Sequence, residues 1–141
     1  MENHAQGTLP DIRQTQLLKA PIAKVWEAVA TAEGIAVWFM PNNFRPVLGY
    51  EFHLEAGPFG NSPCKVTELD PPNKLSFSWG KDWSLTFELA ERDGQTEFTL
   101  IHSGWSAEGV TEFGQPHADV RGNMNQGWIG IMQKLVGYVE G

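Results

Sequence analysis

The period of hydrophobic residues changes twice along this 141-residue chain. The segment from Asp11 to Lys19 carries spaced apolar residues, ends just before Pro21, and predicts a first strand. Apolar residues then recur at i, i+3, i+4 and i+7 from Ile22 to Val29, the spacing of a helix that faces a core. Thr31 is placed to cap a second short helix, which stops before Pro41. The pattern therefore predicts one strand followed by two short helices.

From Tyr50 onward the period becomes two, which is typical of half-buried strands. The alternation is clearest over Leu75–Trp79 and Trp83–Leu89. A last strand, Gln95–Ser103, places His102 on the same face as its apolar residues. Short turn signals separate the strands and predict an antiparallel meander; they lie at Gly57–Gly60, Asp70–Asn73, Gly80–Asp82 and Asp93-Gly94.

The C-terminal part of the chain returns to helical spacing after a predicted loop from Gly104 to His117. The stripe is formed by Val120, Met124, Trp128, Ile131, Leu135 and Tyr138. Four glycines interrupt this helix, and each costs about 1 kcal/mol relative to alanine in a helix interior; they are Gly122, Gly127, Gly130 and Gly137. Either close packing against the sheet or space left for a bound guest would explain them, and close packing is favoured.

Together these elements predict an α+β fold in which a curved antiparallel sheet wraps around a long C-terminal helix. Two short helices follow the first strand. Residues 1–10 are expected to form a flexible N-terminal leader, and residues 11–141 a single domain, since a chain of this length fits one domain with its own core.

Composition and charge narrow the possible functions. The net charge of −7, without a cluster of Lys and Arg, argues against nucleic acid as a partner. Residues 1–10 lack a signal or transit pattern, and no stretch reaches membrane-spanning length, so we expect a cytoplasmic protein without stable membrane insertion. The single cysteine, Cys64, has no Cys and His companions for a zinc site. No metal and no cofactor are predicted.

Motifs of common hydrolases are absent from the sequence: there is no Gly-x-Ser-x-Gly elbow, catalytic Cys-His pair or His-Glu-x-x-His helix. Of the four histidines, only His102 lies on a predicted inward face. It is a weak catalytic candidate, able to act as an acid or base or to donate a hydrogen bond to a ligand. A structural histidine bonded to a neighbour is the favoured alternative, so an enzyme is less expected than a binding protein.

Several short motifs, weak singly, are specific in their order and spacing. They are Pro21 with Val25-Trp26, Trp38, Glu68-Leu69-Asp70-Pro71-Pro72, Leu75-Ser76-Phe77-Ser78-Trp79, Thr99-Leu100, His102-Ser103-Gly104-Trp105 and Gly127-Trp128. In this arrangement the chain resembles, from Ile12 to Val139, the family named for activators of the ninety-kilodalton heat-shock protein ATPase. That family belongs to the START-like (SRPBCC) superfamily, which has a helix-grip fold, and the chain is similar to its bacterial single-domain members.

The resemblance implies a cavity between the curved sheet and the C-terminal helix, which the wider superfamily uses for lipids, sterols, polyketides or plant phenolics. The leading hypothesis is that the protein binds a small hydrophobic, lipid-like or aromatic molecule there, in a stress-related role. The alternatives are a cyclase or lyase that uses His102, and a module that binds a chaperone. The candidate ligand-binding residues are Trp38, Phe52, Phe77, Trp79, Phe87, Phe98, Leu100, His102, Trp105, Met124, Trp128, Ile131, Met132 and Leu135; Arg121 or Gln126 would reach a polar group.

Overall fold

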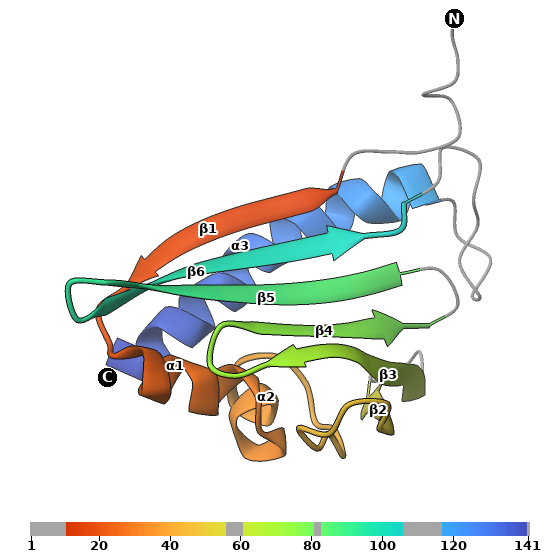
Figure 1. The fold of residues 1–141 in the computed structure, drawn as a ribbon. Helices are drawn as coiled ribbons and strands as arrows, with labels where there is room; N and C mark the ends of the chain where they lie inside the picture. The colour runs from red at the N-terminus through yellow and green to blue at the C-terminus, as the bar shows by residue number, and fades with distance from the viewer. Residues whose placement is uncertain (1–10, 56–60, 81–82, 106–116, 141) are drawn as a thin grey trace, which may run out of the picture.

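The computed structural model describes residues 11–55, 61–80, 83–105 and 117–140. These residues form six strands and three helices (Figure 1). The strands are β1 (Ile12–Leu18), β2 (Glu51–Glu55), β3 (Asn61–Asp70), β4 (Lys74–Trp79), β5 (Trp83–Arg92) and β6 (Gln95–Ser103), and the helices are α1 (Ile22–Val29), α2 (Ala32–Trp38) and α3 (His117–Glu140). The leader at 1–10, the turn at 57–60 and the loop residues 106–116 lie outside the described residues.

The strands form one antiparallel sheet in the order β1-β6-β5-β4-β3-β2. Strands β2 to β6 are neighbours in sequence order, which confirms the predicted meander, and β1 pairs with β6 at one edge. Ile12 lies opposite His102 and Leu18 lies opposite Thr96 in this pairing. The edge strands β1 and β2 do not pair with each other, so the sheet is curved but open.

The short helices begin where the sequence indicates. The Thr31 hydroxyl accepts a hydrogen bond from the backbone N–H of Gly34 at 3.0 Å, which confirms the predicted N-cap of α2. Pro21 lies at the N-cap of α1. Helix α3 begins at His117, three residues before the apolar stripe at Val120. The first turn of the helix therefore precedes the first residue of its hydrophobic pattern.

Two of the predicted turns join their strands as expected. The backbone N–H of Asn73 donates to the carbonyl oxygen of Asp70 at 2.8 Å and closes the turn between β3 and β4. Asp93 and Gly94 connect β5 to β6 with φ values of 54° and 80°. Positive φ at two successive residues suits a tight hairpin, and a glycine adopts it without a steric cost.

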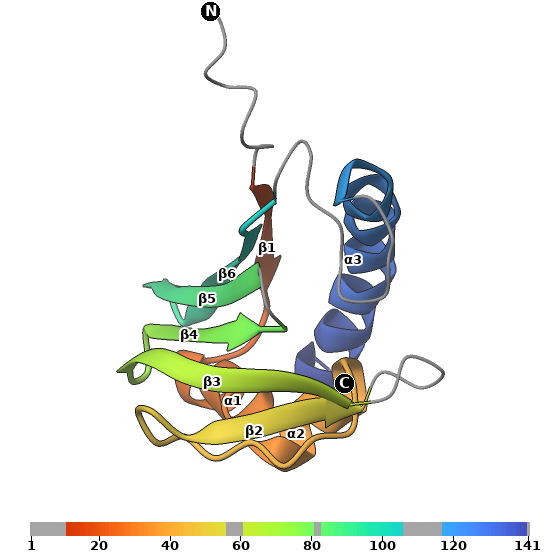
Figure 2. The same cartoon turned by 90° about the vertical axis from the view of Figure 1, so that its right-hand side faces the viewer.

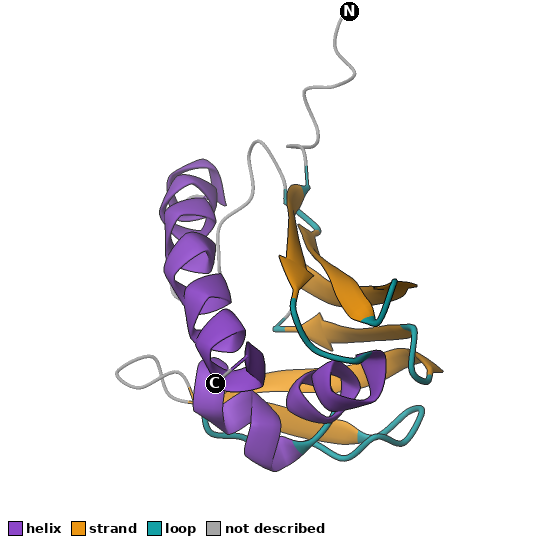
Figure 3. Cartoon of the chain, turned by 90° about the vertical axis from the view of Figure 1, so that its left-hand side faces the viewer, coloured by secondary structure: helices purple, strands orange, loops and turns teal. Residues whose placement is uncertain are grey.

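All three helices lie on the concave side of the sheet (Figures 2 and 3). Helix α3 runs along this side, and α1 and α2 contact it near its C-terminal end. Alternate strand residues point inward, so Leu85, Phe87 and Leu89 of β5 are buried while the residues between them are half-buried. The core therefore fills the space between sheet and helices.

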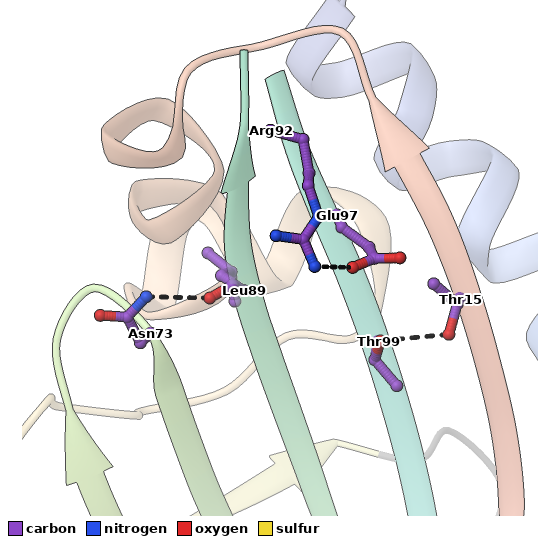
Figure 4. Close-up of polar contacts among 6 residues, drawn as sticks. All are labelled: Thr15, Asn73, Leu89, Arg92, Glu97 and Thr99. Atoms are coloured by element: carbon purple, nitrogen blue, oxygen red, sulfur yellow. Dashed lines mark hydrogen bonds and ion pairs between the residues drawn. The ribbon is translucent and has the colours of Figure 1, made fainter. Parts of the chain in front are cut away.

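Polar contacts join neighbouring strands on the opposite, outer face and at the strand ends (Figure 4). The hydroxyls of Thr15 and Thr99 are 3.1 Å apart, and Arg92 pairs with Glu97 at 3.0 Å. The side-chain amide of Asn73 donates to the Leu89 carbonyl oxygen at 3.0 Å. One side of the sheet is thus polar and the other apolar, as the alternation predicts.

The glycines of α3 are not explained by either sequence-based reading. All four are exposed, and an added Cβ at Gly122, Gly127, Gly130 or Gly137 would meet no heavy atom within 4 Å. The favoured expectation of close packing is therefore wrong. These positions also do not make room beside the sheet, because they lie on the side of α3 that faces away from the core.

Candidate functional site

The structure brings the predicted ligand-binding residues together on the concave side of the sheet. They come from α2, β2, β4, β5, β6, α3 and the residue Trp105 just after β6. All are buried except Met124 and Ile131, which are half-buried and pack against the same core. The predicted set is therefore one continuous interior, although burial alone does not distinguish a ligand site from a core.

Aromatic rings contact one another across this interior. Phe77 lies 5.2 Å from Phe52 and 6.0 Å from Phe87, measured between ring centroids, and Phe87 lies 5.5 Å from Trp38. Phe39 extends the contacts toward α3, at 5.0 Å from the Trp128 ring. Such spacings are those of favourable aromatic pairs. The rings therefore pack against each other as a filled interior.

Four tryptophans surround His102, and we call Trp79, Trp83, Trp105 and Trp128 the tryptophan cluster. The His102 ring stacks on Trp79 at 5.2 Å with an angle of 28° between the planes. Trp83 meets it edge-on at 4.9 Å, Trp105 lies 4.6 Å away, and Trp128 lies 5.9 Å away. The cluster lies where β4 and β6 end and β5 begins, so three strands and α3 position it.

Rings of this interior that are absent from the predicted site include Trp83, Phe39 and Phe44. The alternation Trp83-Ser84-Leu85 places Trp83 on the same face as buried Leu85, so the sequence contained a signal for it. Phe39 is different, because it is the C-cap residue of α2 with φ −123° and ψ −89°. Helical spacing does not determine where a residue at a helix end points.

One hydrogen bond orients the His102 ring, and a second one holds the backbone of this residue. Its side chain is 0% exposed. The indole Nε1–H of Trp128 donates to His102 Nδ1 at 3.0 Å, and the Nε1–H of Trp105 donates to the His102 carbonyl oxygen at 2.9 Å. The other ring nitrogen, Nε2, is buried and has no hydrogen-bond partner among the residues that the structure describes.

Burial, and secondarily the positive charge of Arg121, lower the pKa of His102 from 6.5 to about 3. A buried cationic imidazolium would lose its hydration without gaining a counter-ion, so the neutral form is favoured. At neutral pH His102 is therefore an uncharged imidazole. Such a ring donates one hydrogen bond and accepts another, but it does not hold the extra proton that a general acid delivers.

Polar contacts also join α3 to β1. The side-chain amide of Gln14, on the inner side of β1, donates to the Asn125 carbonyl oxygen at 3.1 Å. Arg121 donates to the Asp11 carbonyl oxygen at 3.4 Å, whereas Gln126 is exposed. Of the two polar residues considered for a ligand contact, only Arg121 thus lies beside the interior, and its charge acts on His102.

A hollow of about 570 Å³ lies elsewhere, over the outer side of β2, β3 and β4. Its polar lining comes from Glu51, His53, Lys65 and Ser78. Phe52 is the one predicted site residue that borders it. Because charged and polar side chains line it, this hollow does not match the expected hydrophobic site.

Metal and membrane sites receive no support from the described part of the chain. No group of three or more His, Cys, Asp or Glu among the described residues is arranged to hold a metal ion. Cys64 is buried. Within the described ranges, no helix has both the length and the hydropathy needed to cross a membrane.

A curved antiparallel sheet that holds a long C-terminal helix over an aromatic interior defines the helix-grip class of the START-like (SRPBCC) superfamily. Within it, the chain belongs to the family described as "Activator of Hsp90 ATPase homolog 1-like protein", whose model matches residues 19–140. This finding confirms the resemblance that the motifs indicated. No functionally curated protein matches the chain.

Solved structures agree with this assignment. Protein BH1534 of Bacillus halodurans is 44% identical, with a TM-score of 0.85 over 94% of this chain and 99% of that one. The Aha1 dimer of Colwellia psychrerythraea is 21% identical, with a TM-score of 0.75 over 94% of this chain and 97% of that one. CalU16 of Micromonospora echinospora is 22% identical, with a TM-score of 0.74 over 92% and 75%. The last two similarities concern the fold alone.

Proposed function

We propose that this protein binds a small hydrophobic, aromatic molecule between its sheet and α3, without transforming it. The observation that carries the proposal is the tryptophan cluster around a buried, neutral His102. Ligand sites are mostly apolar with a few placed polar groups, and this part of the interior has that character. Members of this fold class bind hydrophobic ligands, which supports the same conclusion.

Entry of a ligand requires some of these rings to move, because they are in mutual contact. Trp83 is the half-buried member of the tryptophan cluster, while the other three are at most 5% exposed. On α3, Val120 and Met124 are half-buried, whereas Met132 and Leu135 are buried. The proposed entry route therefore lies beside Trp83 and the N-terminal half of α3, where the described side chains of the interior are least buried.

A titration of the ¹⁵N-labelled protein tests this function. Fatty acids, sterols and flavonoid-like compounds are added in turn, and shifts of backbone amide and tryptophan indole signals are followed. We expect saturable shifts at Trp79, Trp105 and Trp128 with at least one aromatic compound. Uniform silence across a broad panel would count against the proposal.

A matched variant separates interior binding from adhesion to the surface. Leu17 lies on the outer side of β1 and is 47% exposed. The Leu17→Ser variant removes an exposed apolar side chain without touching the interior. Unchanged affinity in this variant supports binding in the interior, whereas lost affinity would place the compound on the surface.

The catalytic alternative receives less support from the geometry. A cyclase or lyase that uses His102 as an acid or base needs a group that exchanges protons near neutral pH. The depressed pKa of His102 and its complete burial oppose that role. For this reason we do not assign His102 a reaction step.

The second candidate function is interaction with a chaperone, which the family assignment favours. Its test is a pull-down with the bacterial ninety-kilodalton heat-shock protein, together with its ATPase rate at saturating concentrations of this protein. Stimulation of the ATPase would support a co-chaperone role. No association at high concentration would dismiss it and leave the ligand-binding function unaffected.

A further inference from the structure

The two nitrogens of the His102 ring have different surroundings. An indole N–H only donates, so the Nδ1 atom that receives the Trp128 hydrogen bond carries no proton. In a neutral imidazole the single proton then resides on Nε2. Trp128 therefore acts as a positioning residue that holds His102 as a hydrogen-bond donor at Nε2.

Among the residues that the structure describes, this donor has no acceptor. Nε2 is buried and bonds to no described residue, and an unsatisfied buried donor costs about 1–3 kcal/mol. Native structures contain few such groups, and each calls for an explanation. The indole rings that pack against His102 supply apolar surface and no acceptor oxygen.

We propose that the interior selects a planar aromatic ligand with a carbonyl oxygen at its edge, which accepts the His102 Nε2–H hydrogen bond while its ring packs against the tryptophan cluster. This inference rests on the proposed function, because it names the class of ligand for the same site. A neutral carbonyl fits the His102 donor better than a carboxylate, because the surrounding rings are apolar and burial of a full charge is costly. Arg121, whose charge reaches His102, donates to the Asp11 carbonyl oxygen. A ligand that only donates gains nothing from Nε2–H.

Two compounds of the same ring skeleton test the preference. 1-Tetralone and tetralin differ by a carbonyl in place of a methylene group, so their difference in affinity reports the hydrogen bond. We expect 1-tetralone to bind about tenfold more tightly, the effect of roughly one net hydrogen bond. Affinities are measured from amide and indole shifts of the full-length protein.

The two measurements distinguish failure of the proposed ligand-binding function from failure of the carbonyl preference. If neither compound binds, the proposed function and this inference both fail for small aromatic molecules. If both bind with equal affinity, the interior does bind hydrophobic molecules but the inference is overturned. A tenfold preference for 1-tetralone supports both.

Variants assign the preference to His102. In His102→Phe the preference for 1-tetralone should disappear, whereas Phe87→Leu, a change elsewhere in the interior, should weaken both compounds and keep their ratio. Phe87 contacts Trp38, Phe77 and Phe98 rather than the cluster. A preference that survives in His102→Phe would overturn the inference.

A measurement on the unsubstituted protein covers the case in which His102→Phe does not fold. The ring ¹⁵N signals of histidine distinguish protonated from bare nitrogens, and those of His102 are recognised by their proximity to the Trp128 indole proton. We expect a proton on Nε2, a bare Nδ1, and a shift of the Nε2–H signal with 1-tetralone but not with tetralin. In Trp128→Phe the tautomer should no longer be fixed, which a purely structural role of Trp128 would not produce. A proton found on Nδ1 would overturn the inference.

Discussion

At the scale of single residues, the bond between His102 and Trp128 joins two side chains that are 26 positions apart in the sequence. It connects β6 to α3 inside an apolar environment, where each partner depends on the other for its hydrogen bond. Loss of one partner leaves the other buried and unsatisfied. The pair therefore contributes to stability as a unit.

A double-mutant cycle measures the coupling free energy between His102 and Trp128. His102→Phe and Trp128→Phe should each lower the free energy of unfolding by about 1–3 kcal/mol, and the double variant should lose about 1 kcal/mol less than the sum. Unfolding in urea, followed by far-UV circular dichroism, gives the values. Phe87→Leu combined with His102→Phe is the control, because Phe87 packs against Trp38, Phe77 and Phe98 instead of the His102 ring. Strict additivity for the first pair would contradict the expectation.

The depressed pKa of His102 also predicts a pH dependence of stability. Between pH 6.5 and about pH 3 the unfolded chain binds a proton at His102 that the folded protein does not, so the free energy of unfolding falls as the pH falls. From pH 6.5 to pH 4.5 the loss is about 2 kcal/mol, and above about pH 7.5 this contribution is constant. Urea unfolding over this pH range should show the slope.

Two histidine substitutions show whether His102 causes this pH dependence of the free energy of unfolding. His102→Gln should flatten the dependence between pH 6.5 and pH 4.5, and His53→Gln, on the outer side of β2, is the matched deletion of an imidazole outside the interior. Equal slopes in the parent and His102→Gln would show that His102 titrates normally. The carboxylates are common to all three proteins, so their contribution cancels in the differences.

At the scale of elements, α3 is held by one face while its other face is rich in glycine. Trp128, Met132 and Leu135 fix it to the core, and hydrogen bonds from Gln14 and Arg121 join it to β1 and the residue before it. The glycines on its exposed side lose more conformational entropy on folding than alanine would, and packing does not require glycine there. The exposed glycines therefore make α3 less stable than a helix with alanine at the same positions would be.

Alanine substitutions should recover this loss. Gly127→Ala and Gly130→Ala are expected to raise the free energy of unfolding by up to about 1 kcal/mol each, because a Cβ there meets no atom within 4 Å. Thermal unfolding and urea unfolding both give the change. Gly34→Ala is the matched control in α2: its Cβ would lie 2.7 Å from the Glu27 carbonyl oxygen and should destabilise the protein. Destabilisation by all three would reject the explanation.

At the scale of the whole molecule, the three helices and the concave side of the sheet enclose one core. Cys64 belongs to this core, on β3 opposite Phe52 and Trp79. Burial raises the pKa of its thiol from 9.0 to about 12, despite a hydrogen-bonding contribution from the Leu54 backbone in the opposite direction. Its thiolate form is thus rare as long as the fold is intact.

Thiol labelling therefore reports opening of the whole fold. At pH 8 a disulfide reagent should react with Cys64 at least about a thousandfold more slowly in the folded protein than in urea, since a shift of three pKa units reduces the thiolate by that factor. The absorbance of the released thiol measures the rate. A ligand of the interior should slow the reaction further. Rapid labelling without urea would show that β3 opens independently.

The sequence determined most of the elements by itself, because hydrophobic period and turn chemistry are local properties. The period-two segments became β4, β5 and β6, Thr31 capped α2, and the Asp93-Gly94 turn formed a hairpin. The family followed from ordered motifs, and the model match over residues 19–140 confirmed it. The inward position of His102 also followed from the alternation on β6.

Only the tertiary structure decided how the interior is filled and how His102 is bonded. The position of Phe39 depends on a helix end, and the exposed glycines of α3 depend on which side faces the core. The tautomer of His102 depends on an indole from a helix that is distant in the sequence. These features arise from contacts between elements, and the spacing of residues along one element does not contain the distances between two.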